Sequence, residues 1–151
     1  GAILLSAGMT GNIISKLAVG IMSDRIGAVK ATSVLLISNL TGIIILIVLT
    51  SFPYLVIGAF LFGSCYGISA VSLSLLTRYF FGMERYIRLF PVITFVSNVG
   101  SAAALSIVGF IYDFSGSYMP GFILSLGIIG ISMTFLGISV LEKKKAEIND
   151  V

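Results

Sequence analysis

The sequence predicts an all-α membrane protein, and three observations support this. Of its 151 residues, 58% are hydrophobic and only 10% are charged. The apolar residues form long uninterrupted stretches, and the basic residues gather in alternate connections between those stretches. A soluble globular domain carries about 25% charged residues. So few charges cannot cover a water-facing surface, but they suit a surface in lipid, where a charge at mid-bilayer costs several kcal/mol.

The apolar stretches predict five transmembrane helices. A helix that spans the hydrocarbon core needs about 20 mostly apolar residues. Pro53, Pro91 and Pro120 stand at or just before the first turn of the third, fourth and fifth spans, where proline removes no helical hydrogen bond. The predicted spans cover about residues 2–22, 31–50, 54–77, 89–111 and 118–141, and a cytoplasmic tail follows at 142–151.

The charges of the connections predict the orientation. The connection at 51–53 has no charge, and the connection after the fourth span has only Asp113. The other connections and the tail are basic, with Arg25, Lys30, Arg78, Arg85, Arg88, Lys143, Lys144 and Lys145. Basic loops stay on the cytoplasmic side. We therefore expect a multi-pass protein of the cell membrane with a cytoplasmic C-terminus.

The sequence lacks the residues that several classes of function need. The chain has no histidine, and its one cysteine, Cys65, lies in an apolar run, so neither a disulfide within the chain nor a metal-ligand spacing is expected. No phosphate-binding glycine loop or nucleophile motif is present, so we expect no enzyme and no cofactor. No cluster of basic and aromatic residues suggests nucleic acid. The chain starts at Gly1 within an apolar stretch, which predicts a fragment or trimmed chain without a signal peptide.

Small residues in two spans predict close helix packing. Ala59, Gly63 and Gly67 form one row in the third span, and Gly100 and Ala104 form another in the fourth. Such rows let helix backbones approach in lipid. The alternative is a helix contact that moves between two conformations.

The most specific local pattern closes the first span. It reads Gly20-Ile21-Met22-Ser23-Asp24-Arg25-Ile26-Gly27 and is followed by Lys30. Asp24 follows directly on an apolar span and needs a helix N-terminus or an arginine as partner. Gly20 permits close approach of another helix, and Gly27 permits a tight turn. We expect a gating motif here, formed by Gly20, Asp24, Arg25, Gly27 and Lys30.

This pattern, Gly-x-x-x-Asp-Arg-x-Gly-x-x-Lys, resembles the signature loop between the second and third helices of each half of the major facilitator superfamily. The resemblance implies that the five spans are helices eight to twelve of a twelve-helix bundle. It also implies a partner, the missing N-terminal half of the same transporter.

Two segments carry a narrower resemblance. Residues 16–25 resemble helix eight of the oxalate:formate antiporter and monocarboxylate transporter families, and residues 112–118 are similar to their loop between helices eleven and twelve. In those families a cation, usually arginine, stands at the position of Lys16 and contacts the substrate carboxylate. Arginine can bind a carboxylate through two parallel hydrogen bonds, whereas lysine offers a single compact charge. The predicted span at 89–111 adds no second cation, which favours a monoanion over a dianion such as oxalate.

Lys16 also stands out on physical grounds. It lies eight residues before Asp24, or roughly 12 Å along a helix, well inside a core of about 30 Å. An ionisable residue at that depth indicates a functional site. The alternative is that the long side chain carries its ammonium to the interface. Asn12 and Ser15 on nearby turns favour a water-lined face.

Polar residues in the other spans complete the candidate set. Thr94, Ser97, Asn98 and Ser101 share one helical face, where they either line a substrate path or bond to other helices. Tyr66, Ser69 and Ser72 form a weaker group, whereas Asn39 and Thr41 are expected to bond to neighbouring backbone. The predicted substrate-binding residues are Lys16, Asn12, Tyr66, Thr94, Asn98 and Ser101.

These residues and the resemblance together predict a secondary active transporter. It would carry a small organic anion, a monocarboxylate, by alternating access, with proton symport or anion exchange as the energy source. Its expected partners are that anion and membrane lipid, without nucleic acid. The alternative is a non-transporting membrane scaffold or a truncated transporter fragment. A membrane enzyme would need an interfacial cluster of His, Asp or Glu, which the sequence lacks.

Overall fold

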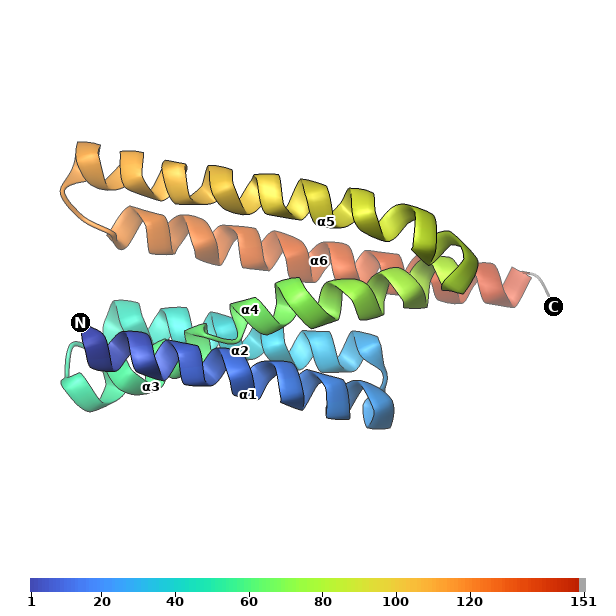
Figure 1. The fold of residues 1–151 in the computed structure, drawn as a ribbon, viewed down its shortest axis with the longest axis horizontal. Coiled ribbons are helices and arrows are strands. Elements are labelled where there is room, and N and C mark those ends of the chain that lie inside the picture. The colour runs from blue at the N-terminus through green and yellow to red at the C-terminus, as the bar shows by residue number, and fades with distance from the viewer. Residues whose placement is uncertain (150–151) are drawn as a thin grey trace.

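The computed structural model describes residues 1–149, which are almost entirely helical, and the last two residues of the predicted tail lie outside them. No strand occurs in residues 1–149, which confirms the predicted all-α class. Figure 1 shows the elements in chain order: α1 (Ala2–Ile26), α2 (Ala28–Val48), α3 (Phe52–Phe62), α4 (Cys65–Gly67), a π-helical turn η1 (Ile68–Ser72), α5 (Leu73–Ser115) and α6 (Met119–Asn149).

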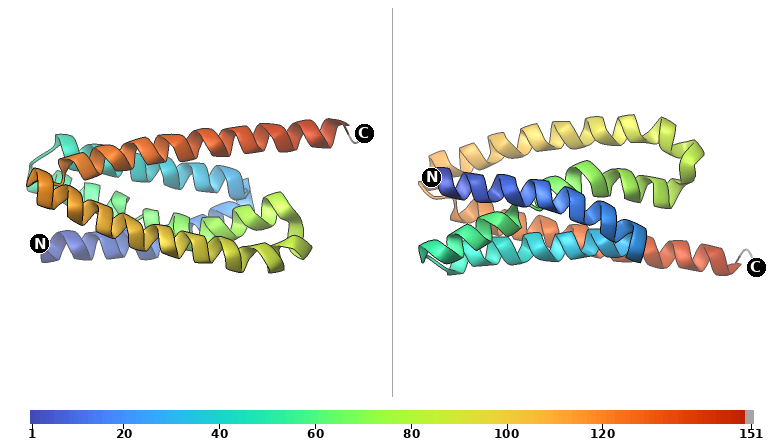
Figure 2. Two further views of the ribbon diagram at one scale, coloured as in Figure 1. Left: turned by 90° about the horizontal axis from the view of Figure 1, so that it is seen from above. Right: turned by 60° about the horizontal axis from the view of Figure 1, so that its bottom comes forward.

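The helices form two layers. α1, α2 and α3 pack on one another, and α6 packs on both α2 and α5. α4, η1 and the start of α5 lead from the first layer to the second (Figure 1). The views in Figure 2 show that the later part of α5 runs back alongside α6. The turn between α1 and α2 and the reversal within α5 lie toward the end where the chain finishes, opposite the N-terminus.

Four helical stretches in the described chain are long and apolar enough to cross a membrane. The third of them, Phe52–Ser115, has 64 residues. A straight helix of that length would measure about 96 Å, roughly three times the hydrocarbon core. Gly82 divides it, because φ 73° and ψ 172° at this residue cannot continue a helix, and the chain reverses direction there (Figure 1). The stretch thus forms two membrane-spanning segments, one on each side of Gly82.

The reversal at Gly82 is shorter than the sequence suggested. A loop was expected at residues 78–88, but helical structure continues on both sides of Gly82 and includes Arg85 and Arg88. Pro91 therefore lies inside α5 and not in a first turn, which corrects the expectation for that proline. The physical reason is that one glycine with positive φ reverses the chain by itself. The charged residues around it are exposed, so they need no loop to reach solvent.

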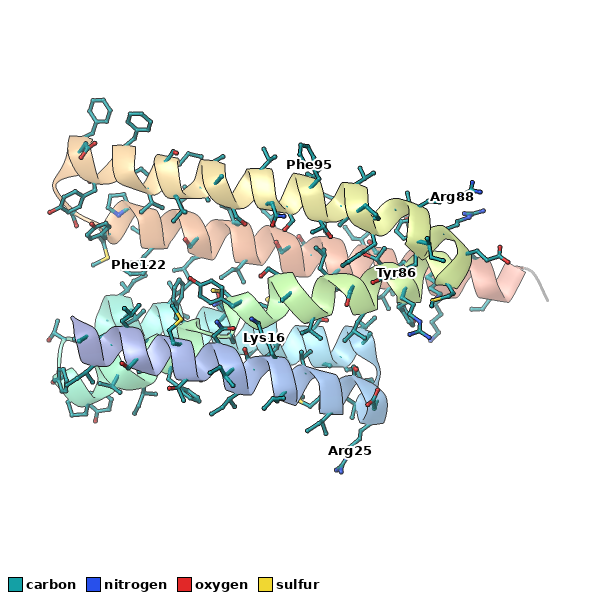
Figure 3. The ribbon with its side chains drawn as sticks, viewed as in Figure 1. Lys16, Arg25, Tyr86, Arg88, Phe95 and Phe122 are labelled. Carbon is teal, nitrogen blue, oxygen red and sulfur yellow. The ribbon has the colours of Figure 1, made fainter. Side chains whose placement is uncertain are left out.

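The outer surface is apolar over most of its area. Among the residues whose burial the structure describes, five hydrophobic ones are buried: Val19, Ala31, Leu35, Leu36 and Ile43. Large side chains such as Phe95 and Leu105 are 68% and 78% exposed, and Figure 3 shows Phe95 pointing away from the other helices. Monomeric soluble proteins rarely expose apolar patches of this extent. The bundle is therefore a membrane protein whose surface is covered by lipid or by further helices.

Glycines set the distance between the helices of the first layer. A Cβ at Gly11 would overlap the carbonyl group of Phe60, and one at Gly63 would overlap the carbonyl oxygen of Gly8. The row at Ala59, Gly63 and Gly67 thus packs against α1. The second predicted row does not pack within the described chain, because a Cβ at Gly100 would meet no atom within 4 Å.

Candidate functional site

Lys16 lies in the middle of α1, beside the face that this helix buries. Gly11, Ser15 and Val19 form the buried face, and Lys16 is half-buried at its edge. Asn12 lies one turn earlier on the same edge. Figure 3 shows Lys16 at the centre of the molecule, remote from both ends of the bundle. The backbone of Lys16 thus lies in the middle part of the helix and not at either end.

A neighbouring helical span has a local break in its regular hydrogen bonding beside this position. α3 ends at Phe62, Gly63 and Ser64 form a turn, and the short elements α4 and η1 follow before α5 begins. The backbone dihedrals at Gly63, Ser64 and Gly67 stay in the right-handed helical region, so residues 54–77 remain one helical path in which only the hydrogen bonding is irregular. The adjacent Gly63 and Ser64 were the available signal, because neither residue favours a helix interior.

A side chain from α2 stabilises the break. In a regular helix the N–H of Tyr66 would donate to the carbonyl of Phe62, but here it donates to the carbonyl of Gly63 at 3.3 Å. The amide of Asn39, which is 3% exposed, donates to the freed Phe62 oxygen at 3.0 Å. Ser64 adds a longer bond to the carbonyl of Leu35 at 3.4 Å. The expectation that Asn39 bonds to a neighbouring backbone is thereby confirmed.

The break and Lys16 lie at similar depth. α3 has 11 residues, about 16 Å of helix, which reaches roughly the middle of a core of about 30 Å. Lys16 lies ten residues before the end of α1 at Ile26, or about 15 Å. The two elements touch at this level, because a Cβ at Gly67 would lie 2.7 Å from the Ser15 hydroxyl oxygen. The residue next to Lys16 therefore packs against the irregular part of the following span.

Asn12 and Tyr66 add polar atoms to this region. The Oδ1 atom of Asn12 is buried and has no hydrogen-bond partner in the described chain. The Asn12 backbone faces Gly63, whose Cβ would lie 2.9 Å from its nitrogen. Tyr66 is 48% exposed and lines a cavity of about 260 Å³ with Gly8, Gly63, Phe122 and other residues of α1, α2 and α3. Three of the predicted substrate-binding residues thus come from neighbouring elements.

The other three predicted residues, Thr94, Asn98 and Ser101, lie apart on α5. Asn98 and Ser101 are exposed, and the Ser101 hydroxyl donates to the carbonyl of Ser97 in its own helix at 2.9 Å. Thr94 is half-buried, and its hydroxyl has no partner among residues 1–149. The main contacts of α1 are with α2, α3, α4 and η1, whereas this part of α5 runs beside α6. The described chain does not join the two groups.

One residue of the weaker predicted polar group is fully buried. Ser72, at the end of η1, is 0% exposed, and its hydroxyl oxygen has no partner among the described residues. Its place at the end of a π-helical turn could not be foreseen, because nothing in its neighbours specifies that geometry.

The predicted gating motif occupies the turn between α1 and α2. Gly27 is the single residue between these helices, and its φ of 88° explains the need for glycine. Asp24, Arg25 and Lys30 are exposed, and Figure 3 shows Arg25 pointing away from the bundle. A Cβ at Gly20 would meet no described atom within 4 Å. The motif thus forms the turn and presents its charges outward.

Comparison with known proteins gives one match. The family model described as Major Facilitator Superfamily matches residues 1–150, nearly the whole chain. No curated protein and no solved structure matched the chain.

Proposed function

Because the chain belongs to the major facilitator superfamily, a family of transporters, we propose that it carries a small organic anion, a monocarboxylate, across the cell membrane. Alternating access would present the midplane site to either side in turn, and either proton symport or anion exchange would supply the energy. The observation that carries the proposal is the half-buried Lys16 in the middle of α1, next to a span whose hydrogen bonding is irregular at Gly63 and Ser64.

The local chemistry supports an anionic substrate. Transporters commonly bind substrate near the midplane, where discontinuous helices leave polar backbone groups available. Lys16 supplies one positive charge, and Asn12 and Tyr66 supply neutral hydrogen-bonding groups. A single cation balances the charge of one carboxylate, which favours a monoanion. Thr94, Asn98 and Ser101 would join the path in the complete protein, and the motif from Gly20 to Lys30 would stabilise one state of the gate.

Uptake by the full-length protein in proteoliposomes tests the role of Lys16. A panel of radiolabelled formate, acetate, lactate, oxalate and malonate defines the substrate. We expect Lys16→Ala to reduce monocarboxylate uptake at least tenfold, because a hydrogen bond to a charged group is worth about 1.5–3 kcal/mol. Lys16→Arg keeps the charge and should retain part of the uptake.

Lys145→Ala is the matched control, because it removes the same charge from an exposed position in the last turns of α6. Protein yield and orientation in the liposomes are measured for each variant. Equal uptake by Lys16→Ala and Lys145→Ala would refute the proposed site. Loading the liposomes with anion, or imposing a pH gradient, separates exchange from proton symport.

A further inference from the structure

Lys143 makes an unusual pair of contacts for a residue near the chain end. Its ammonium nitrogen donates to the backbone carbonyl of Tyr79 at 2.6 Å. The same nitrogen lies 3.7 Å from the centroid of the Tyr79 ring. The two residues are 64 positions apart in the sequence. The sequence predicted a solvated tail here, whereas the structure shows α6 continuing to Asn149 with Lys143 joined to α5.

The carbonyl that Lys143 reaches lies in the last turn before a break. Gly82 follows Tyr79 by three residues and cannot continue the helix. The last four carbonyls of a helix lack N–H partners, and the negative end of the helix dipole lies there. Lysine side chains satisfy such carbonyls at many helix ends. In this protein the lysine comes from a different helix.

Lys143 connects α6 to α5 beside an open hollow between the two helices. α5 and α6 leave an open hollow of about 500 Å³ between them, lined by Phe80, Phe81, Ser139, Glu142, Lys143 and Ala146. Tyr79 also packs edge-on against Phe80, with ring centroids 5.1 Å apart. Lys143 lies 24 residues after Met119, or about 36 Å along α6, so it has passed the hydrocarbon core of about 30 Å.

We propose that Lys143 is a positioning residue that caps the first segment of α5 from the end of α6 and thereby fixes the reversal at Gly82. The cap sets where the chain re-enters the membrane. The polar face of the second segment, with Thr94, Asn98 and Ser101, takes its position from that point. This role is independent of the identity of the transported substrate.

Hydrogen exchange of the full-length protein in detergent tests this role. We expect Lys143→Ala to speed amide exchange in peptides covering residues 79–88 about tenfold, the change in open population that one lost charged hydrogen bond produces. Peptides from α1 should exchange at the wild-type rate. Lys143→Arg should restore most of the protection, because arginine also carries donors and charge.

Two further variants separate the possible causes. Lys144→Ala removes the same charge from an exposed neighbour and should leave residues 79–88 protected. Tyr79→Leu removes the ring but keeps the carbonyl, so it should have a smaller effect than Lys143→Ala. Lys143→Met retains most of the side-chain length and replaces Lys143→Ala if that variant does not fold. Equal exchange at residues 79–88 in the Lys143 variants and in Lys144→Ala would overturn the proposal.

Discussion

Asn39 illustrates how one polar side chain fixes the backbone of another helix. Its amide is buried and donates to the Phe62 carbonyl oxygen, which the Tyr66 N–H of its own helix does not reach. In lipid, an unpaired carbonyl has no water to replace the lost partner. The bond therefore stabilises the irregular turn at Gly63 and Ser64 relative to a regular helix.

Replacing Asn39 should destabilise the bundle. Asn39→Leu has similar volume but cannot donate, so the Phe62 carbonyl stays unpaired at a cost of about 1–2 kcal/mol. Thermal unfolding of the full-length protein in detergent measures the loss. Thr41→Val is the control, because the Thr41 hydroxyl bonds only within its own helix, to Ile37 at 2.8 Å. If both variants unfold at the same temperature, the Asn39 bond does not hold the break.

Lys16 could be singled out from the sequence because its depth depends only on its distance from the end of an apolar stretch. Its neighbours were partly predictable for the same reason, since Asn12 and Lys16 are one turn apart on any helix. The approach of Gly63 to Asn12 was not predictable, because it depends on how α1 and α3 pack.

At the scale of elements, the helices were predictable, but the geometry of their irregular points was not, even where Gly63 and Ser64 offered a local signal. Hydropathy predicts an apolar helix at 54–77, and no proline signals a break there. The break depends on Asn39, which is 23 residues away from Phe62 in the sequence. The sharp reversal at Gly82 was not predicted for a different reason. The charges around it suggested a loop, whereas exposed charges are equally compatible with helix ends.

The contact between α1 and α3 predicts a sharp difference between two glycines. Gly63→Ala forces a methyl group against the Gly8 carbonyl, so we expect a loss of about 1–3 kcal/mol or failure to assemble. Gly130→Ala is the control, because a Cβ there meets no described atom within 4 Å and alanine favours helix. Thermal unfolding and the yield of monodisperse protein measure both. Equal behaviour of the two variants would mean that the helices do not approach this closely.

At the scale of the whole molecule, the membrane class follows from properties that need no knowledge of packing. Each span is recognised by its own length and apolarity. The basic residues of each connection indicate on which side of the membrane that connection lies, independently of the other connections. The structure places the turn at Gly27, the reversal at Gly82 and the C-terminal end of α6 toward the same end of the bundle (Figure 1). These are also the connections that carry the basic residues.

This arrangement predicts which residues a membrane-impermeant reagent reaches in intact cells. In a Cys65→Ala background, Ser51→Cys lies just before α3 and Phe114→Cys in the last turn of α5, both at ends of the bundle without basic residues, and both should react with an impermeant maleimide from outside. Met83→Cys and Lys144→Cys lie next to basic residues, which stay on the cytoplasmic side, so they should react only after the cells are permeabilised. All four positions are exposed in the isolated bundle, so differences in labelling report on sidedness. If Ser51→Cys and Met83→Cys reacted from the same side, the segment between them would not cross the bilayer, and the division of Phe52–Ser115 into two passes would be wrong.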